Sequence, residues 1–480
     1  MAKEIAWDWI ANNASQIIEV SDKVWGYAEL GLMEFKSSEL LAKTLEEYGF
    51  TVERGIADMP TAFVATYGSG SPIIAINGEY DALPGLSQKA VAHQEPLEEG
   101  APGHGCGHNI HGVSGLAGAI GAKMAMEKHN IGGTIKFFGC PAEETFSGKV
   151  FMVRDGYFDG VDAAISHHAG STNTAGIGSS LAVKSAKFHF HGVTSHAAFT
   201  PEHGRSALDA LELMNVGVNY MREHVLQEAR IHYVIEKGGM QPNIVPDYAR
   251  SWYYIRAPEM SQVDEMITWI LNIAKGADLM ARTTHEAHVV EGCSNVIPSK
   301  SLSEIVIGNM RTIGVPKYSK EEMGFLKEMN KSITKEAKIE LLRMTKRPNW
   351  EEFVDVLIDE TIPDPWDEGI VWAGSTDVGD VSWVTPTMEF TTSTGLLGDP
   401  GHSWQTVAVC GMSIGHKAML FAGKTIAGSV LDLLMRPELL QGMKDEFKKR
   451  LHGRRYKSPI PDNVKPPHGV AKQAAEATRT

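Results

Sequence analysis

Short apolar segments alternate with helical segments along the first third of the chain, and this alternation limits the possible folds more than any other feature. An amphipathic segment at 37–50 and a small-residue segment at 111–130 have helical character. The apolar segments between and after them have the length of buried strands; they are residues 61–68, 72–80, 134–140 and 162–166. We therefore predict an α/β fold with a mainly parallel sheet covered by helices on both faces.

A second pattern begins at about residue 186 and interrupts the first. Its segments are, in order, a strand at 187–192, a helix at 204–225, strands at 230–239 and 248–257, a helix at 261–281 and a strand at 284–292. This β-α-β-β-α-β order is that of a ferredoxin-like α+β unit. We expect such a complete unit to form a separate domain inserted into the larger one.

The length of 480 residues also favours more than one domain. We predict a first part of the large domain at 1–184, the inserted domain at 185–299 and a second part of the large domain at 300–445. Residues 446–480 are basic and Pro-rich. We expect this tail to be extended or poorly ordered.

Charge and cysteine content exclude several classes of protein. A net charge of −14 argues against a nucleic-acid partner. The sequence has no apolar run of roughly 18 residues, which a membrane-spanning helix needs, and its start lacks the layout of a secretion signal. The four cysteines are too few for a disulfide framework. We therefore expect a cytoplasmic protein without a membrane partner, in which Cys106 is free to act as a thiolate.

Residues 104–112 contain the strongest chemical signal of the chain. Cys106 and His108 are separated by Gly107, which allows both side chains to point into one site. Sulfur and imidazole ligands suit zinc or a neighbouring first-row metal. Taken alone, such a loop is also compatible with a purely structural role.

Two adjacent carboxylates, Glu143 and Glu144, follow the apolar segment 134–140. The carboxyl end of a buried strand is where α/β sheets place their active sites. Neighbouring glutamates in a loop can diverge, so that one binds metal while the other transfers a proton. A solvated acidic turn is the alternative for an isolated pair.

Histidines and a further acidic residue also stand at the ends of predicted strands or in loops. His167 and His168 end the apolar segment 162–166, and His402 lies in a Gly- and Pro-rich loop before an apolar helix. Each histidine alone is more often structural than a ligand, but several of these groups follow strands of one predicted sheet. Asp81 follows segment 72–80 and could hydrogen-bond the far nitrogen of a ligating histidine.

Ordered motifs across residues 5–465 resemble a known family, the aminoacylase/carboxypeptidase-type binuclear metallopeptidases, in the branch that includes the auxin-conjugate amidohydrolases. Within that branch, the resemblance is closest to members that act on p-aminobenzoyl-glutamate. The motifs lie at residues 78–88, 103–109, 139–144, 147–156, 204–210, 255–260, 375–383 and 402–405.

The resemblance implies two divalent metal ions, zinc or manganese, bridged by Cys106. It implies that His108 and His168 complete the site of one metal ion. Glu144 and His402 are then expected to complete the site of the other. The family spacing from the metal-bound glutamate favours His168 over His167.

The resemblance also implies roles outside the ligand set. Glu143 is expected to be the general base and acid, and Asp81 is counted with it among the catalytic groups. His196 is expected to reach across a dimer interface and polarise the scissile carbonyl. Asn243 and Arg256 are expected to bind the carboxylate of the substrate. A homodimer through the inserted domain follows, with a related second subunit as a further possible partner.

The expected reaction is hydrolysis of the amide of an N-acyl amino acid, with p-aminobenzoyl-glutamate as the first candidate. The alternatives are other conjugates, such as indoleacetyl- or benzoyl-amino acids, or a non-catalytic subunit of a hetero-oligomer. Two residues depart from the wider family: Asn109 stands where much of it has Asp, and Glu79 stands where plant-type members have Asp. Both departures agree with the p-aminobenzoyl-glutamate branch.

Overall fold

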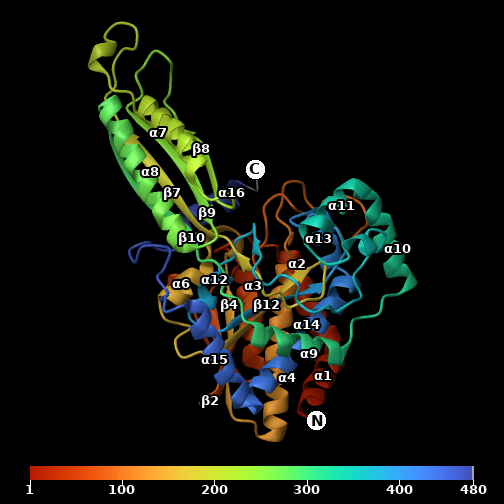
Figure 1. The fold of residues 1–480 in the computed structure, drawn as a ribbon. Helices are drawn as coiled ribbons and strands as arrows, with labels where there is room; N and C mark the ends of the chain where they lie inside the picture. Colours follow the sequence, from red (N-terminus) through yellow and green to blue (C-terminus); the bar gives the residue numbers. More distant parts are fainter. Residues whose placement is uncertain (478–480) are drawn as a thin grey trace.

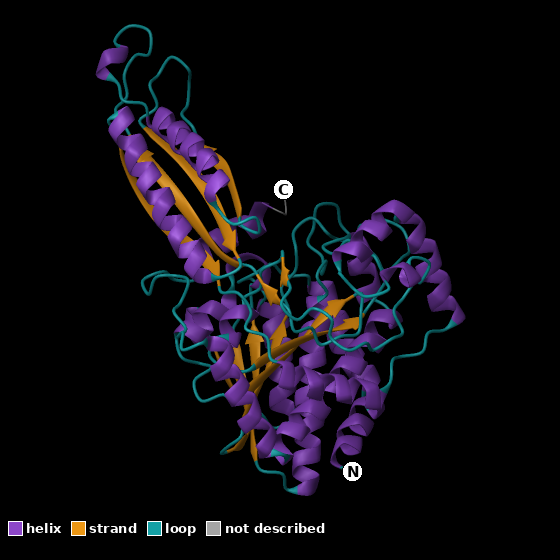
Figure 2. Cartoon of the chain, in the orientation of Figure 1, coloured by secondary structure: helices purple, strands orange, loops and turns teal. Residues whose placement is uncertain are grey.

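The computed structural model describes residues 1–477 of the chain. A large domain is built on a six-stranded sheet, and a smaller domain with a four-stranded sheet projects from it (Figure 1). Helices surround the large sheet, whereas the helices of the smaller domain lie together against its sheet (Figure 2). A short parallel pair, β6 (Ser179–Ser180) and β11 (Val371–Trp372), lies outside both sheets.

The strand order in the large sheet is β1-β2-β4-β3-β5-β12. Strands β4, β3, β5 and β12 are parallel, and β2 and β1 continue the sheet in antiparallel fashion at one edge. The bounds are β1 Thr51–Arg54, β2 Phe63–Ser69, β3 Ile73–Glu79, β4 Gly133–Cys140, β5 Ala163–Gly170 and β12 Thr387–Ser393.

Alternate side chains of the central strands enter two different cores. In β3, Ile74 and Ile76 are buried in a core on one face of the sheet, whereas Ala75 is buried in a core on the opposite face. Because side chains of a strand alternate between its faces, a sheet buried on both sides needs apolar residues at consecutive positions. The predicted fold class, a mainly parallel sheet with helices on both faces, is confirmed.

The first face of the sheet is covered mainly by α4 (His108–His129) and α14 (Ser413–Met435), which pack closely against each other. Gly118 of α4 lies at this contact, where an added Cβ atom would come within 2.5 Å of the Ile426 side chain of α14. Helix α14 has the length and hydropathy of a membrane-spanning helix, but most of it is buried in this core. Its composition is therefore explained by its central position.

Together with the other helices, α4 and α14 form both layers and part of the surface of the large domain. The α-helices are α1 Ala2–Asn12, α2 Ala14–Tyr27, α3 Phe35–Glu47, α4 His108–His129, α5 Glu143–Phe146, α6 Gly148–Arg154, α9 Lys300–Ile313, α10 Lys320–Met329, α11 Lys335–Met344, α12 Val378–Ser382, α13 Trp404–Cys410, α14 Ser413–Met435, α15 Pro437–Leu451 and α16 His468–Ala477. The 3₁₀ turns are η1 Ile56–Asp58, η4 Asn330–Ser332 and η5 Trp350–Phe353.

The projecting domain has the antiparallel strand order β10-β7-β9-β8, with two helices packed on its sheet. Every second residue of β9 is buried, as expected when one face of a sheet packs on helices. The order matches the predicted ferredoxin-like unit. The bounds are β7 Ala182–His191, η2 Pro201–His203, α7 Ala207–Met221, η3 Arg222–His224, β8 Arg230–Lys237, β9 Tyr248–Ala257, α8 Met260–Ala281 and β10 Thr284–Cys293.

The tail differs from the sequence expectation. The expected tail at 446–480 begins inside α15, and its described part ends in the helix α16. Between these helices, Ile460 is only 3% exposed and belongs to a core of the large domain. The Tyr456 hydroxyl donates to buried Asp380 at 2.9 Å. The net basic character of the tail concealed these apolar and hydrogen-bonding anchors, which hold it against the domain.

Candidate metal centre

The predicted ligands and their neighbours gather where the parallel strands end. Glu79 is the last residue of β3, and Glu143 begins α5 just after β4. His168 lies near the end of β5, while His108 is the first residue of α4. The carboxyl ends of parallel strands share one edge of the sheet, which brings segments distant in sequence to one place. His402 joins them from the loop before α13.

Gly107 gives the Cys106–His108 loop its shape. Its φ of 74° lies in the left-handed region that glycine adopts without strain. A Cβ atom there would approach the Cβ of Ala169 to 2.5 Å and the Sγ of Cys410 to 3.1 Å. A glycine is therefore required for Cys106 and His108 to turn toward one point.

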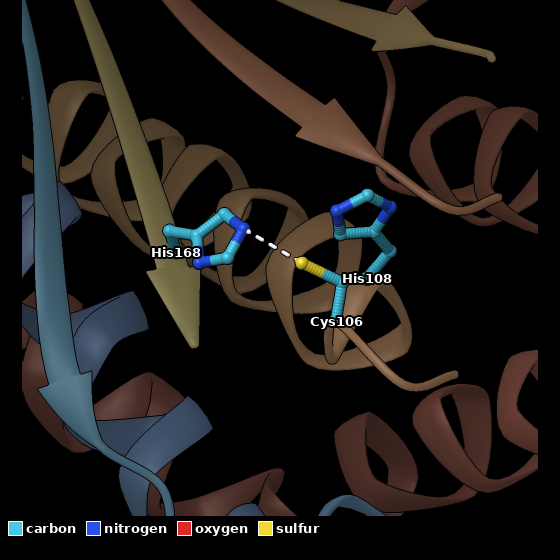
Figure 3. Close-up of side chains that lie close together, drawn as sticks. All are labelled: Cys106, His108 and His168. Atoms are coloured by element: carbon cyan, nitrogen blue, oxygen red, sulfur yellow. Dashed lines mark hydrogen bonds between the residues drawn. The ribbon is translucent and has the colours of Figure 1, made fainter. Parts of the chain in front are cut away.

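Cys106, His108 and His168 form the first group of candidate ligands (Figure 3). Their ligand atoms lie within 4.8 Å of one another, and Cys106 Sγ is 3.3 Å from His168 Nε2. The Nδ1 atom of His108 is 2.8 Å from Asp81 Oδ1. Its Nε2 atom is buried without a hydrogen-bond partner. This arrangement leaves Nε2 available for a metal ion, as in a carboxylate–histidine–metal chain.

Cys106, Glu144 and His402 form the second group, with ligand atoms again within 4.8 Å of one another. The Nε2 atom of His402 is 3.5 Å from Glu144 Oε2, and Glu144 Oε1 is buried without a partner. Cys106 belongs to both groups. The orphaned atoms and the mixture of sulfur, nitrogen and oxygen donors fit a pair of divalent cations that share one thiolate.

The two neighbouring histidines of β5 are in different environments. Both ring nitrogens of His167 have hydroxyl partners at 2.8 Å, Ser114 Oγ at Nδ1 and Thr392 Oγ1 at Nε2. Burial lowers the pKa of His167 to about 3, so this ring is neutral and held in place. Only His168 directs a nitrogen toward Cys106. The geometry therefore favours His168 over His167 as a ligand.

Glu143 and Asp81 flank the ligands. Burial, together with the nearby Glu79, Asp377 and Glu144 carboxylates, raises the pKa of Glu143 well above its usual value. A carboxyl oxygen of Glu143 lies within 4.8 Å of a Glu79 oxygen and a His108 nitrogen. Asp81 Oδ2 accepts a hydrogen bond from the backbone N–H of Glu144 at 2.9 Å. Asp81 thus ties His108 and Glu144 to one carboxylate.

A buried lysine beneath these residues was missed in the sequence. Lys149 Nζ lies 2.5 Å from Glu79 Oε1 and 2.6 Å from Asp377 Oδ1, and none of the three side chains is more than 1% exposed. The backbone N–H of Lys149 also donates to Asp377 at 2.8 Å. The ammonium group supplies the positive charge that two buried carboxylates require. Its only signal in the sequence was its place within the 147–156 motif.

The remaining predicted residues lie at opposite ends of the projecting domain. The loop between β7 and α7 and the loop between β8 and β9 lie at its outer end (Figure 1). They carry His196 and Asn243, and the Ala197 N–H donates to the Asn243 carbonyl at 3.0 Å. Arg256 lies at the inner end, where its Nη1 donates to Ser375 Oγ of the large domain at 2.7 Å. One chain therefore does not bring His196 and Asn243 to Arg256.

One cavity is lined by candidate ligands, and a second cavity shares a wall residue with it. One, of about 250 Å³, is lined by Cys106, His168 and His402. A larger one, of about 400 Å³, lies along the edge strand β12, and Ser171 lines both cavities. The ligand-bearing edge of the sheet thus has space for a small molecule that extends in two directions.

Comparison with known proteins gives a consistent assignment. Residues 75–403 match the model of peptidase family M20/M25/M40. The chain is 40% identical to one of the subunits of p-aminobenzoyl-glutamate hydrolase of Escherichia coli, over 96% of this chain and 97% of that protein.

Two solved structures have a similar fold. A putative aminohydrolase from methicillin-resistant Staphylococcus aureus has a TM-score of 0.63 at 18% identity and covers 90% of this chain and 100% of its own. A dinuclear metal-binding M20 peptidase of Bacillus subtilis has a TM-score of 0.57 at 16% identity, with 88% and 99% coverage. Both likenesses concern the fold alone.

Proposed function

The chain is a metal-dependent amidohydrolase of peptidase family M20/M25/M40, and we propose that it hydrolyses p-aminobenzoyl-glutamate to p-aminobenzoate and glutamate. The family expected from the sequence motifs is confirmed. The proposed substrate rests on the 40% identity over nearly the whole length of both chains to the Escherichia coli hydrolase of that name. The observation that carries the chemistry is Cys106, which belongs to two groups of candidate ligands at once.

We propose that Cys106, His108 and His168 hold one divalent ion and that Cys106, Glu144 and His402 hold the other. Zinc suits the sulfur and nitrogen donors, and manganese is the alternative. When bound, such ions acidify a water molecule and polarise the scissile carbonyl. Glu143 takes the proton of the attacking water and passes it to the departing amine of glutamate. Its raised pKa makes it a better proton acceptor than an exposed glutamate.

The other predicted residues orient the substrate in this proposal. Arg256 binds the carboxylate of the amino acid, since a guanidinium can hold a carboxylate through two hydrogen bonds. His196 and Asn243 lie far from Arg256 in one chain and act from a second copy. His196 then stabilises the oxyanion, and Asn243 binds the same carboxylate as Arg256.

We propose that the second copy docks through the projecting domain. Exposed apolar side chains on α7 and on the edge strand β8 support this assignment, because such groups are usually covered in an assembly; they are Leu213, Val216, Tyr220, Val234 and Ile235. The related Escherichia coli protein is by name one subunit of its enzyme. A related second subunit can therefore take the place of the second copy.

The four cysteines are all free, which suits a reducing compartment. We therefore propose that the protein works in the cytoplasm, where Cys106 stays available as a metal ligand.

A direct assay tests the proposed reaction. Purified protein reconstituted with Zn²⁺ or Mn²⁺ is incubated with p-aminobenzoyl-glutamate, benzoyl-glutamate and indoleacetyl-aspartate, and release of the free acid is measured. We expect the highest kcat/KM with p-aminobenzoyl-glutamate. Hydrolysis of none of them by the metal-loaded protein would contradict the proposal and favour a non-catalytic subunit.

A further inference from the structure

The larger cavity beside the metal centre has an aromatic, acidic lining. Trp366 and Trp372 contribute aromatic surface, and their indole N–H groups are already bound to the Thr345 carbonyl and to Asp367 Oδ2. Small residues make up most of the remaining wall. A flat apolar group fits such a lining, because aromatic side chains whose polar atoms are satisfied offer mainly apolar surface to a ligand.

The charge of the cavity lining indicates which half of the proposed substrate the cavity binds. Among the described residues that line this cavity, Asp367 and Glu389 are the ionisable acids, and no basic residue is among them. Asp367 disfavours the glutamate half, which carries two negative charges of its own, whereas burial and the nearby Glu79 raise the pKa of Glu389 to about 8. The nearby cation, Arg256, is bound to Ser375 at the cavity wall. The glutamate half is therefore best placed at Arg256 and the neutral aryl half inside the cavity.

Glu389 has an unused acceptor in this lining. It faces the cavity from the edge strand β12, at the position paired with Ser166 of β5. Its side chain is partly exposed, and its Oε2 atom is buried without a hydrogen-bond partner. One of its carboxyl oxygens lies within 4.8 Å of a Glu79 oxygen and a His111 nitrogen, whereas both carboxylate oxygens of Asp367 accept protein N–H groups. Thr174 Oγ1 is a second buried oxygen of the lining without a partner. Such orphaned acceptors are rare, because burial without a hydrogen bond is unfavourable.

We propose that this cavity binds the aryl half of the substrate and that Glu389 accepts a hydrogen bond from the aromatic amino group, so that Glu389 selects p-aminobenzoyl over unsubstituted benzoyl conjugates. This inference rests on the proposed function and adds a specificity residue to it. A carboxyl group offers an acceptor oxygen whether or not it is protonated. An analogue that lacks the amino group would leave this buried acceptor without a partner. A site of this kind discriminates strongly against such an analogue.

A comparison of two substrates tests the proposal. The kcat/KM values for p-aminobenzoyl-glutamate and benzoyl-glutamate are measured with the metal-loaded wild type, Glu389→Met and Glu389→Gln. We expect the wild type to prefer the amino substrate by about 10-fold or more. Glu389→Met, which lacks an acceptor oxygen, should lose this preference, and Glu389→Gln, which keeps one, should retain part of it. Glu368→Met is the matched control, since Glu368 is 55% exposed and lies outside the cavity lining.

Product binding gives a readout that needs neither turnover nor a variant. Calorimetry on the metal-free wild type should show tighter binding of p-aminobenzoate than of benzoate, by about the same factor. Equal binding of the two acids, or an unchanged kcat/KM ratio in a folded Glu389→Met protein, would overturn the inference. Equal hydrolysis of both glutamate conjugates by the wild type would also overturn it while leaving the proposed reaction intact. Hydrolysis of neither would instead refute the proposed reaction.

Discussion

Glu143 and Glu144 are neighbours in sequence that differ in their surroundings. Glu144 Oε2 lies 3.5 Å from His402 Nε2, and its backbone N–H is bound by Asp81. Glu143 instead approaches Glu79 and His108. Because adjacent side chains diverge at the start of the short helix α5, one pair of identical residues can serve two tasks. The proposal gives metal binding to Glu144 and proton transfer to Glu143.

The same substitution should therefore lower the metal content at Glu144 and leave it unchanged at Glu143. Glu143→Gln removes the proton acceptor, and we expect kcat to fall by about 100-fold or more with two metal ions still bound per chain. Glu144→Gln removes a ligand, and we expect the metal content to fall. Metal analysis of the dialysed proteins alongside steady-state kinetics makes the comparison. A normal kcat in Glu143→Gln would exclude its role as the base.

The buried carboxyl group of Glu34 should make the stability of the folded chain depend on pH. Its Oε1 accepts from the Ala142 N–H at 2.8 Å, and its Oε2 is buried without a partner. Burial and the neighbouring Asp81 raise the pKa of Glu34 from 4.5 to about 8. Between pH 4.5 and about pH 8, Glu34 is therefore protonated in the folded chain and ionised in the unfolded chain. The contribution of Glu34 to stability is thus present below about pH 4.5 and lost as the pH rises toward 8.

Glu34→Gln should remove this dependence, since the amide does not ionise. We expect the wild type to lose stability relative to Glu34→Gln as the pH rises from 5 to 8. The difference between their free energies of unfolding should change by up to about 1.4 kcal/mol per pH unit. Urea unfolding of both metal-free proteins at several pH values measures the difference. A difference that stays constant over this range would show that Glu34 does not hold its proton in the folded chain.

At the scale of secondary structure, the turn into α4 determines whether Cys106 and His108 converge. An alanine in place of Gly107 adds a Cβ atom to a left-handed residue and drives it against Ala169 and Cys410. We expect Gly107→Ala to weaken metal binding by about 10-fold or more, because the left-handed conformation alone costs about 1 kcal/mol or more and the contact shifts the loop. Titration of the metal-free protein with Zn²⁺ measures the affinity.

Gly26→Ala is the matched control for this turn. Gly26 lies inside α2 with open space around its Cα atom, so a Cβ atom there meets nothing. An alanine also suits a helix better than a glycine. Unchanged metal affinity in both variants would show that the turn at Gly107 does not set the position of the ligands.

The sequence predicts most elements and the end of the sheet at which the candidate ligands gather, but not the contacts between distant polar residues. Strand periodicity identifies β3, β4 and β5, and groups that follow these strands meet at one edge by topology alone. The ion pairs of Lys149 with Glu79 and Asp377 had no such signal, because the three residues come from different elements. A lysine in a predicted helix is usually solvated. The anchoring of the tail by Ile460 was missed for a different reason, because the net basic character of the segment concealed this one buried apolar residue.

For the whole molecule, the separation of Arg256 from His196 is the feature with the largest consequence. Arg256 contacts Ser375 at the base of the projecting domain, while His196 lies exposed in a loop at its outer end. The strands between them are rigid, paired elements of one sheet. Bending of one chain would have to break that sheet to bring the two side chains together. A site that uses both residues therefore needs two chains.

Mixing two inactive variants tests this arrangement. His196→Ala and Arg256→Ala are each expected to have low activity as homodimers, because every site lacks one group. In a hybrid dimer, one of the two sites receives Arg256 from the His196→Ala chain and His196 from the Arg256→Ala chain, and is complete. Random re-association should therefore restore about a quarter of wild-type activity, since about half of the dimers are hybrids with one intact site. Each variant, dissociated and re-associated alone, serves as a control. A mixture with no more activity than the mean of these two controls would show that each chain builds its site alone.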